Sequence, residues 1–224
     1  MRKIAVILYG PPGSGKGTQA NLLSSNLGLI HFDTGRVLEA LLNDPENQKN
    51  KIIQKEKKLF DSGILLTPSF VLEHLKNKVK KISAAGWGIV FSGSPRTLYE
   101  AKGLMPILEK LFGKENIFIF ELDVRESIPE KRNSHRLICR ICGAPLLSAF
   151  YPSKNPKHCP VCAGPFYRRT LDNAKTIKVR MNEYHERTEV IFDFLKKRKY
   201  KVHKINGEPP PYQVFGQLIK YFKK

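Results

Sequence analysis

The sequence lacks any apolar run close to the roughly 20 residues that a membrane-spanning helix needs. Residues 1–9 combine basic residues with an apolar stretch, as signal peptides do, but the stretch ends at Gly10 and Pro11 without a small-residue cleavage site. We therefore interpret this segment as a first strand. We expect a cytoplasmic protein that does not bind membranes.

Acidic residues are scarce, with 20 Asp and Glu against 39 Lys and Arg, which gives a formal net charge of +19. The electrostatic field of such a charge favours the binding of polyanions. It fits a lysine-rich surface on a protein that handles small phosphorylated ligands, and it also fits a nucleic-acid-binding protein. The basic run at 196–199 has no interleaved aromatic residues to stack on bases. We therefore do not expect nucleic acid to be the main partner.

Cysteine is scarce as well, and all four cysteines fall between positions 139 and 162. In a cytosolic protein this clustering argues for a metal site rather than disulfides. Two Cys-x2-Cys pairs are separated by 16 residues, and they consist of Cys139, Cys142, Cys159 and Cys162. Four thiolates fill the tetrahedral coordination of zinc, so the pattern predicts a structural Zn²⁺ site. A nucleic-acid-binding zinc ribbon is the alternative, because basic residues surround the cluster.

Apolar strand-like segments alternate with segments of helical periodicity, which predicts an α/β fold with a parallel sheet and helices on both faces. Five strands are expected, at residues 3–9, 29–32, 88–91, 117–122 and 200–205. Helices are expected at residues 15–27, 34–43, 46–61, 68–82, 98–112, 127–136 and 172–199, and from about 210 onward. Residues 137–167 are rich in Cys, Pro and Gly and lack helical periodicity. Ligands of such folds bind at the carboxyl ends of the strands.

The segment Gly10-x4-Gly15-Lys16 follows the first strand and opens a helix, which is the spacing and context of a phosphate-binding P-loop. Its glycines let backbone N–H groups surround phosphate oxygens, and the helix N-terminus adds a favourable dipole. Lys16 is expected to reach the terminal phosphates. Gly17 stands where the motif usually has Ser or Thr, and Thr18 follows. The motif predicts a P-loop phosphotransferase.

The segment from Gly10 to Gln19 resembles the adenylate kinase family, whose loop characteristically carries Gly-Thr-Gln after the lysine. The resemblance covers essentially the whole chain. Its further motifs are Asp33-Thr-Gly35, Ser62-Gly63, Gly93-Ser-Pro-Arg-Thr97, Arg132, Arg136, the four cysteines, Arg169, Asp172, Arg180 and Ile205-Asn-Gly207. It implies a P-loop NTPase-type three-layer α/β/α core (1–33, 68–131 and 168–224) with a five-stranded parallel sheet. It also implies a helical insertion that binds the nucleoside monophosphate (34–67) and a zinc-containing lid (132–167).

The resemblance further implies the roles of individual residues. The catalytic residues would be Lys16, Arg96, Arg136, Arg169 and Arg180. ATP would contact Gly13, Ser14, Gly15, Lys16, Gly17, Thr18, Arg132, Arg136 and Pro209. The nucleoside monophosphate would contact Thr34, Gly35, Arg36, Ile64, Leu65, Leu66, Gly93, Ser94, Pro95, Arg96, Glu100, Arg169 and Arg180. Mg²⁺ would bridge the donor phosphates, the lid would exclude water, and the protein would be a monomer.

The acceptor side departs from the family pattern. After Thr34-Gly35 the family usually has an Asp and, three residues later, an Arg that binds the AMP phosphate. Here these positions are Arg36 and Glu39. The two fit a salt bridge on one helix face, or Arg36 takes over part of the phosphate contact.

Ser92 stands where the family has an Asp that orders the waters of magnesium, and Leu171 stands where it often has the first of two Asp residues. Glu100 replaces a Gln that reads adenine. A carboxylate accepts from adenine N6 but does not donate to N1 unless protonated, whereas guanine offers two donors. Three functions stay open. We favour an adenylate kinase that converts ATP and AMP into two ADP, ahead of a kinase for another nucleotide such as GMP and ahead of a weak or inactive relative that still binds ATP.

Overall fold

The computed structural model describes residues 3–134, 136–146, 156–168 and 170–222. At its centre is a parallel sheet of five strands in the order β2-β3-β1-β4-β8. The strands are β1 (Ala5–Tyr9), β2 (Leu29–Phe32), β3 (Gly88–Phe91), β4 (Ile117–Asp123) and β8 (Val202–Asn206). The predicted α/β fold with a parallel sheet is therefore confirmed.

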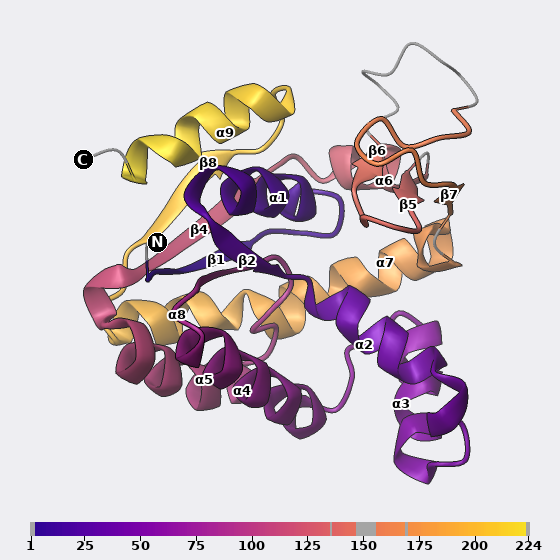
Figure 1. Ribbon diagram of the computed structural model, residues 1–224, viewed down its shortest axis with the longest axis horizontal. Helices are drawn as coiled ribbons and strands as arrows, with labels where there is room; N and C mark the ends of the chain where they lie inside the picture. Colours follow the sequence, from indigo (N-terminus) through magenta and orange to yellow (C-terminus); the bar gives the residue numbers. More distant parts are fainter. Residues whose placement is uncertain (1–2, 135, 147–155, 169, 223–224) are drawn as a thin grey trace.

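Helices cover both faces of the sheet (Figure 1). One face packs against α1 (Lys16–Leu27) and α9 (Pro211–Ile219), and the other packs against α4 (Pro68–Ala84), α5 (Leu98–Phe112) and α8 (Val190–Lys197). Successive residues of β1 enter opposite cores: Ile7 joins the core of α4, α5 and α8, and Leu8 joins that of α1 and α9. Because both faces are buried, β1 is an uninterrupted apolar run rather than an alternating one.

Two smaller parts stand at one end of the sheet (Figure 1). The first is the helix pair α2 (Thr34–Asn43) and α3 (Lys51–Asp61). The second follows α6 (Ser127–Ser134) and contains an antiparallel sheet of order β6-β5-β7, made of β5 (Leu137–Cys139), β6 (Pro145–Leu146) and β7 (Phe166–Tyr167). Strands of two or three residues carry no periodicity, so the sequence did not predict them.

The prediction of one helix over residues 46–61 is wrong. A 3₁₀ turn at Pro45–Asn47 ends before Asn50, whose side-chain oxygen accepts from the backbone N–H of Ile52 at 2.8 Å and starts α3 as its N-cap. Asn competes with the helical backbone for hydrogen bonds and therefore favours a helix start. Further 3₁₀ turns lie at Lys114–Asn116, Thr170–Asp172 and Lys220–Phe222.

The single α-helix expected at 172–199 is also interrupted. α7 (Ala174–Glu183) is followed by a π-helical segment, Tyr184–Thr188, and then by α8. The Thr188 hydroxyl donates to the carbonyl of Arg96 at 2.8 Å, and Tyr184 is buried. π-turns of this kind are frequent at functional sites. Among the described residues, no helix has the length and apolarity needed to cross a membrane.

Candidate active site

The loop after β1 is shaped by Gly10, which has a φ of 139°. A Cβ at this position would lie 2.6 Å from Ser14 Oγ and 2.7 Å from the carbonyl oxygen of Leu122, so no other residue fits without rearrangement. Lys16 begins α1 and turns back over the loop, where its Nζ donates to the carbonyls of Gly10 at 2.7 Å and Pro11 at 2.8 Å. The loop therefore presents a lysine ammonium at a helix N-terminus, which suits phosphate.

The environment of Lys16 is strongly cationic. Burial lowers the pKa of Lys16 well below its usual value, and Arg96, Arg180 and Arg136 lower it further, while Asp33 acts in the opposite direction. Phosphate groups bound here would supply the missing negative charge and favour the protonated lysine.

A cavity of about 670 Å³ lies beside the phosphate loop, and its walls come from the sheet edge, the α2–α3 insertion and the small antiparallel sheet. This volume is in the range of small-molecule sites. The wall contains the predicted nucleotide-contacting residues Gly13, Ser14, Gly15, Lys16, Gly17, Thr18, Thr34, Gly35, Ile64, Leu65, Leu66, Gly93, Ser94, Pro95, Arg96, Glu100, Arg132, Arg136, Arg180 and Pro209. Arg36 is not part of this wall, and Arg169 lies outside the described residues.

Two of the predicted arginines share one carboxylate. Arg136 donates to Asp172 with both Nε (2.9 Å to Oδ2) and NH2 (2.5 Å to Oδ1). NH1 of Arg180 lies 3.6 Å from the same Oδ1. The Asp172 side chain is only 5% exposed, so the pairing holds both guanidinium groups at the cavity before any anion binds. A third arginine, Arg96, donates from Nε to the carbonyl of Gly93 at 2.6 Å.

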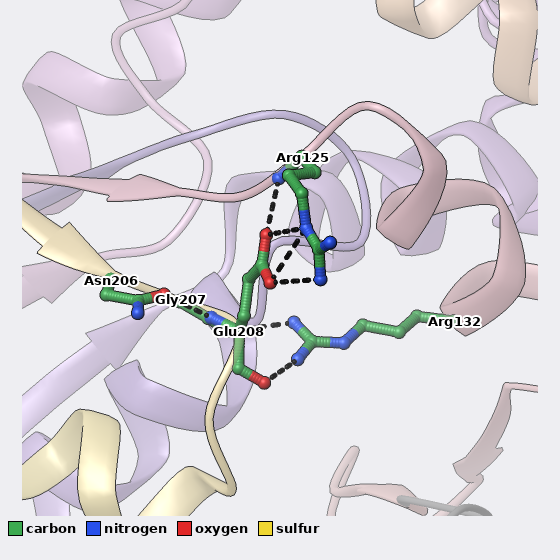
Figure 2. Close-up of polar contacts among 5 residues, drawn as sticks. All are labelled: Arg125, Arg132, Asn206, Gly207 and Glu208. Carbon is green, nitrogen blue, oxygen red and sulfur yellow. Dashed lines mark hydrogen bonds and ion pairs between the residues drawn. The ribbon is translucent and has the colours of Figure 1, made fainter.

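Arg132 holds the loop that follows β8 (Figure 2). Its guanidinium donates to the carbonyls of Gly207 at 3.0 Å and Glu208 at 2.9 Å. The Glu208 carboxylate in turn accepts from Arg125, which binds it through Nε and NH2 (2.7 Å) and lowers the pKa of Glu208. Burial lowers the pKa of Arg132, and Glu208 opposes that shift. Arg125, which precedes α6, and Arg132, which lies in α6, thus fix a loop whose next residue, Pro209, lines the cavity.

Glu100 caps α5 as well as lining the cavity. Its carboxylate accepts from the backbone N–H of Arg96 at 2.8 Å and from the hydroxyl of Thr97 at 3.0 Å, in an arrangement close to a capping box. Burial raises the pKa of Glu100, and the hydrogen bonds from Arg96 and Thr97 oppose this shift. The segment that contains Leu65 also lines the cavity, and it is held by Glu183, whose Oε2 accepts the Leu65 N–H at 3.0 Å.

Sequence reasoning missed a polar chain formed by His31, Asn21 and Ser92, all of which line the cavity. His31 Nδ1 lies 2.6 Å from the Asn21 side-chain oxygen, and Nε2 lies 2.7 Å from Ser92 Oγ. Because an amide oxygen only accepts, Nδ1 carries the proton and Nε2 accepts from the serine hydroxyl. Burial lowers the pKa of His31, which favours this neutral form. A polar residue inside the apolar run 29–32 was the signal that could have revealed it.

Asn133 was missed too. Its side chain lines the cavity from α6 and is 1% exposed, and neither its nitrogen nor its oxygen has a hydrogen-bond partner among the described residues. Nothing in the local sequence distinguishes it from a surface asparagine.

The four cysteines form one cluster, in which all Sγ atoms lie within 4.8 Å of one another. Cys139 Sγ is 3.4 Å from Cys162 Sγ, and Cys142 Sγ is 3.7 Å from Cys159 Sγ. Tetrahedral zinc with Zn–S bonds of about 2.3 Å places its sulfurs roughly 3.8 Å apart. The cluster therefore fits a four-thiolate metal site with no open coordination position.

Comparisons with known proteins agree with this geometry. The family model described as adenylate kinase matches residues 8–200. An adenylate kinase of Caldicellulosiruptor saccharolyticus is 33% identical over 205 residues, which cover 91% of this chain and 92% of that protein. An adenylate kinase of Methanothrix thermoacetophila is 33% identical over 220 residues and 98% of both chains. One from Elusimicrobium minutum is also 33% identical, over 98% of both.

Proposed function

Because the chain belongs to the adenylate kinase family, we propose that it transfers the terminal phosphoryl group of MgATP to AMP and forms two ADP. One observation carries the proposal: a single cavity is lined by the phosphate loop, by residues of the acceptor insertion and by Arg96, Arg136 and Arg180. Phosphoryl transfer depends on positioning and on positive charge around the transferred group, and it needs no nucleophilic side chain.

In this proposal the donor phosphates lie on the loop 10–17 and on Lys16, while Arg132 and Pro209 border the donor nucleoside. The acceptor lies between Thr34, Leu65 and Glu100. The arginines neutralise the charge on both phosphate chains, and their planar forks suit bidentate contacts to phosphate oxygens. Arg169 is proposed for the same role on its resemblance to the family alone.

Magnesium fits this cavity as an ion held mainly by the donor phosphates. Mg²⁺ keeps several waters and uses few protein carboxylates. Asp33 lies on the cavity wall close enough to act on the pKa of Lys16, and Ser92 lies on the same wall. These two side chains would hold the waters of the ion, and the ion would neutralise charge on the donor phosphates.

The four-cysteine cluster is proposed to bind one Zn²⁺ and to stabilise the lid, since a lobe of this size has little core of its own. Residues of this lobe also line the cavity, among them Ile138, Pro145 and Leu146. The division into core, acceptor insertion (34–67) and lid (132–167) follows the same proposal, as do a monomeric state and a cytoplasmic location.

GMP is the second candidate acceptor. Glu100 lines the cavity. When its carboxylate is ionised, it can accept hydrogen bonds but cannot donate them. The N1–H and N2–H₂ groups of guanine would donate to it, whereas adenine offers it only N6–H₂. AMP remains our first choice because the relatives named above are adenylate kinases.

A nucleic-acid-binding zinc ribbon is the non-enzymatic alternative. It predicts tight, salt-sensitive binding to RNA that survives Lys16→Met. The participation of the lobe in the nucleotide cavity favours a lid instead.

A coupled assay with ATP and AMP, GMP, CMP or UMP tests the function. We expect turnover with AMP and a loss of at least about a hundredfold in kcat for Lys16→Met. Lys51→Met, an exposed lysine of α3, serves as the control and should keep full turnover. Preference for GMP would replace the acceptor, and turnover with none of the four would contradict the kinase proposal.

A further inference from the structure

Arg36 connects the acceptor insertion with the lid. It lies in the first turn of α2, where its backbone N–H donates to the N-cap side chain of Asp33 at 3.2 Å. Its NH2 group donates to the backbone carbonyl of Ile141 at 3.0 Å. Ile141 belongs to the turn between β5 and β6 and stands between Cys139 and Cys142. The bond therefore joins two parts of the chain that are 105 residues apart.

The same guanidinium also lies against Gly143. This glycine has a φ of 71°, and a Cβ built on it would overlap the guanidinium of Arg36. Gly143 thus serves a left-handed turn and allows the arginine to approach closely. Gly143 is part of the cavity wall and Arg36 is not. The arginine therefore meets the lid outside the space where nucleotides would bind.

We propose that Arg36 is a positioning residue that holds the lid against the acceptor insertion, and that it is not a ligand of the acceptor phosphate. The contact exists only when the two parts approach each other, so it stabilises the closed cavity. Both nucleotides occupy the closed cavity, and both therefore gain from the contact. A phosphate ligand would assist the acceptor alone. The kinetic part of this inference rests on the proposed function.

The contact is one hydrogen bond from an exposed guanidinium, and a bond of that kind changes a two-state equilibrium by about threefold to tenfold. Removing this hydrogen bond is expected to shift the equilibrium by the same factor toward a form in which the lid and the acceptor insertion are apart. The chemistry of transfer would be unaffected, because Arg96, Arg136 and Arg180 keep their places at the cavity.

Kinetics of Arg36→Met, Arg36→Lys and the control Lys51→Met separate the two roles. We expect Arg36→Met to raise KM for ATP and for AMP by the same factor, about threefold to tenfold, with no fall in kcat. Arg36→Lys keeps one donor and should recover part of this loss, and Lys51→Met should match the unmodified protein. A rise in KM for AMP alone, accompanied by a fall in kcat, would overturn the proposal in favour of a phosphate ligand. Unchanged KM values would overturn it as well.

Hydrogen exchange without nucleotides gives a readout independent of activity. The amide of Cys139 donates to Ala144 and that of Gly143 donates to Cys139 within the turn that Arg36 contacts. These amides should exchange about threefold to tenfold faster in Arg36→Met and at the unmodified rate in Lys51→Met. Equal rates in all three proteins would refute the contact. If the unmodified protein has no kinase activity but the amides still exchange faster in Arg36→Met, the contact is retained and the proposed function is rejected.

Discussion

The carboxylate of Asp172 binds the guanidinium of Arg136 in a two-point contact of 2.9 and 2.5 Å. Arg180 approaches the same carboxylate from α7. A guanidinium that is already oriented loses less conformational entropy when a phosphate arrives. We therefore predict that Asp172 acts on the reaction through the arginines that it orients.

Replacing Asp172 with asparagine should keep the size of the side chain and remove its charge. We expect kcat to fall about tenfold to a hundredfold, because small displacements of positioning groups have effects of that order. The free energy of unfolding should fall by about 1–3 kcal/mol, since two cations lose a nearly buried partner. Steady-state kinetics and urea unfolding measure both. Asp193→Asn, at an exposed position of α8, is the control, and an equal loss in the two variants would contradict the assigned role.

Glu100→Gln tests how the protein recognises the nucleobase of the acceptor nucleotide. An amide can donate to adenine N1 and accept from N6, so KM for AMP should fall about threefold to tenfold. The amide also loses one of the two capping hydrogen bonds, which should cost about 1 kcal/mol in the free energy of unfolding. The exposed Glu73→Gln provides the comparison. An unchanged or higher KM for AMP would mean that Glu100 serves only the helix cap.

Metal analysis tests the cysteine cluster. Freshly purified, reduced protein should contain about one zinc per chain. Chelation, or Cys142→Ser, should lower the melting temperature, and added zinc should restore it only in the unmodified protein. Protein that contains no metal when freshly purified would contradict the site.

His31 should give the protein an acid-sensitive component of stability. Its folded pKa is lowered by burial, so the unfolded chain binds more protons than the folded chain as the pH falls through about 6.5. The free energy of unfolding of the unmodified protein should therefore fall relative to His31→Gln between about pH 7 and pH 5. Above about pH 7.5 the difference should be constant. Urea unfolding across this range measures the difference, and a difference independent of pH would disprove the buried neutral histidine.

The sheet, its flanking helices and the phosphate-loop part of the cavity wall could be predicted from the sequence. The apolar run at residues 5–9 indicates a strand that is buried on both faces. The phosphate loop is recognised from the spacing of its glycines and lysine within residues 10–17. Local pattern therefore contained the information for these parts.

Contacts between distant segments could not be predicted in this way. The π-turn at Tyr184–Thr188 accompanies a contact with Arg96. The start of α3 at Asn50 is different, because it depends on a local N-cap hydrogen bond to Ile52 that the prediction of one helix over residues 46–61 overlooked. The contact from Arg36 to Ile141 depends on how two insertions meet, and neither segment alone indicates it.

The phosphate loop rests on β1, which is buried on both faces, whereas α2, α3 and the small antiparallel sheet stand at one end of the central sheet (Figure 1). The core that joins Leu8 to α1 and α9 contains, among the described residues, none from α2, α3 or the small antiparallel sheet. In evolutionary terms, a protein built this way can change the molecule that it phosphorylates while it inherits its phosphate donor unchanged.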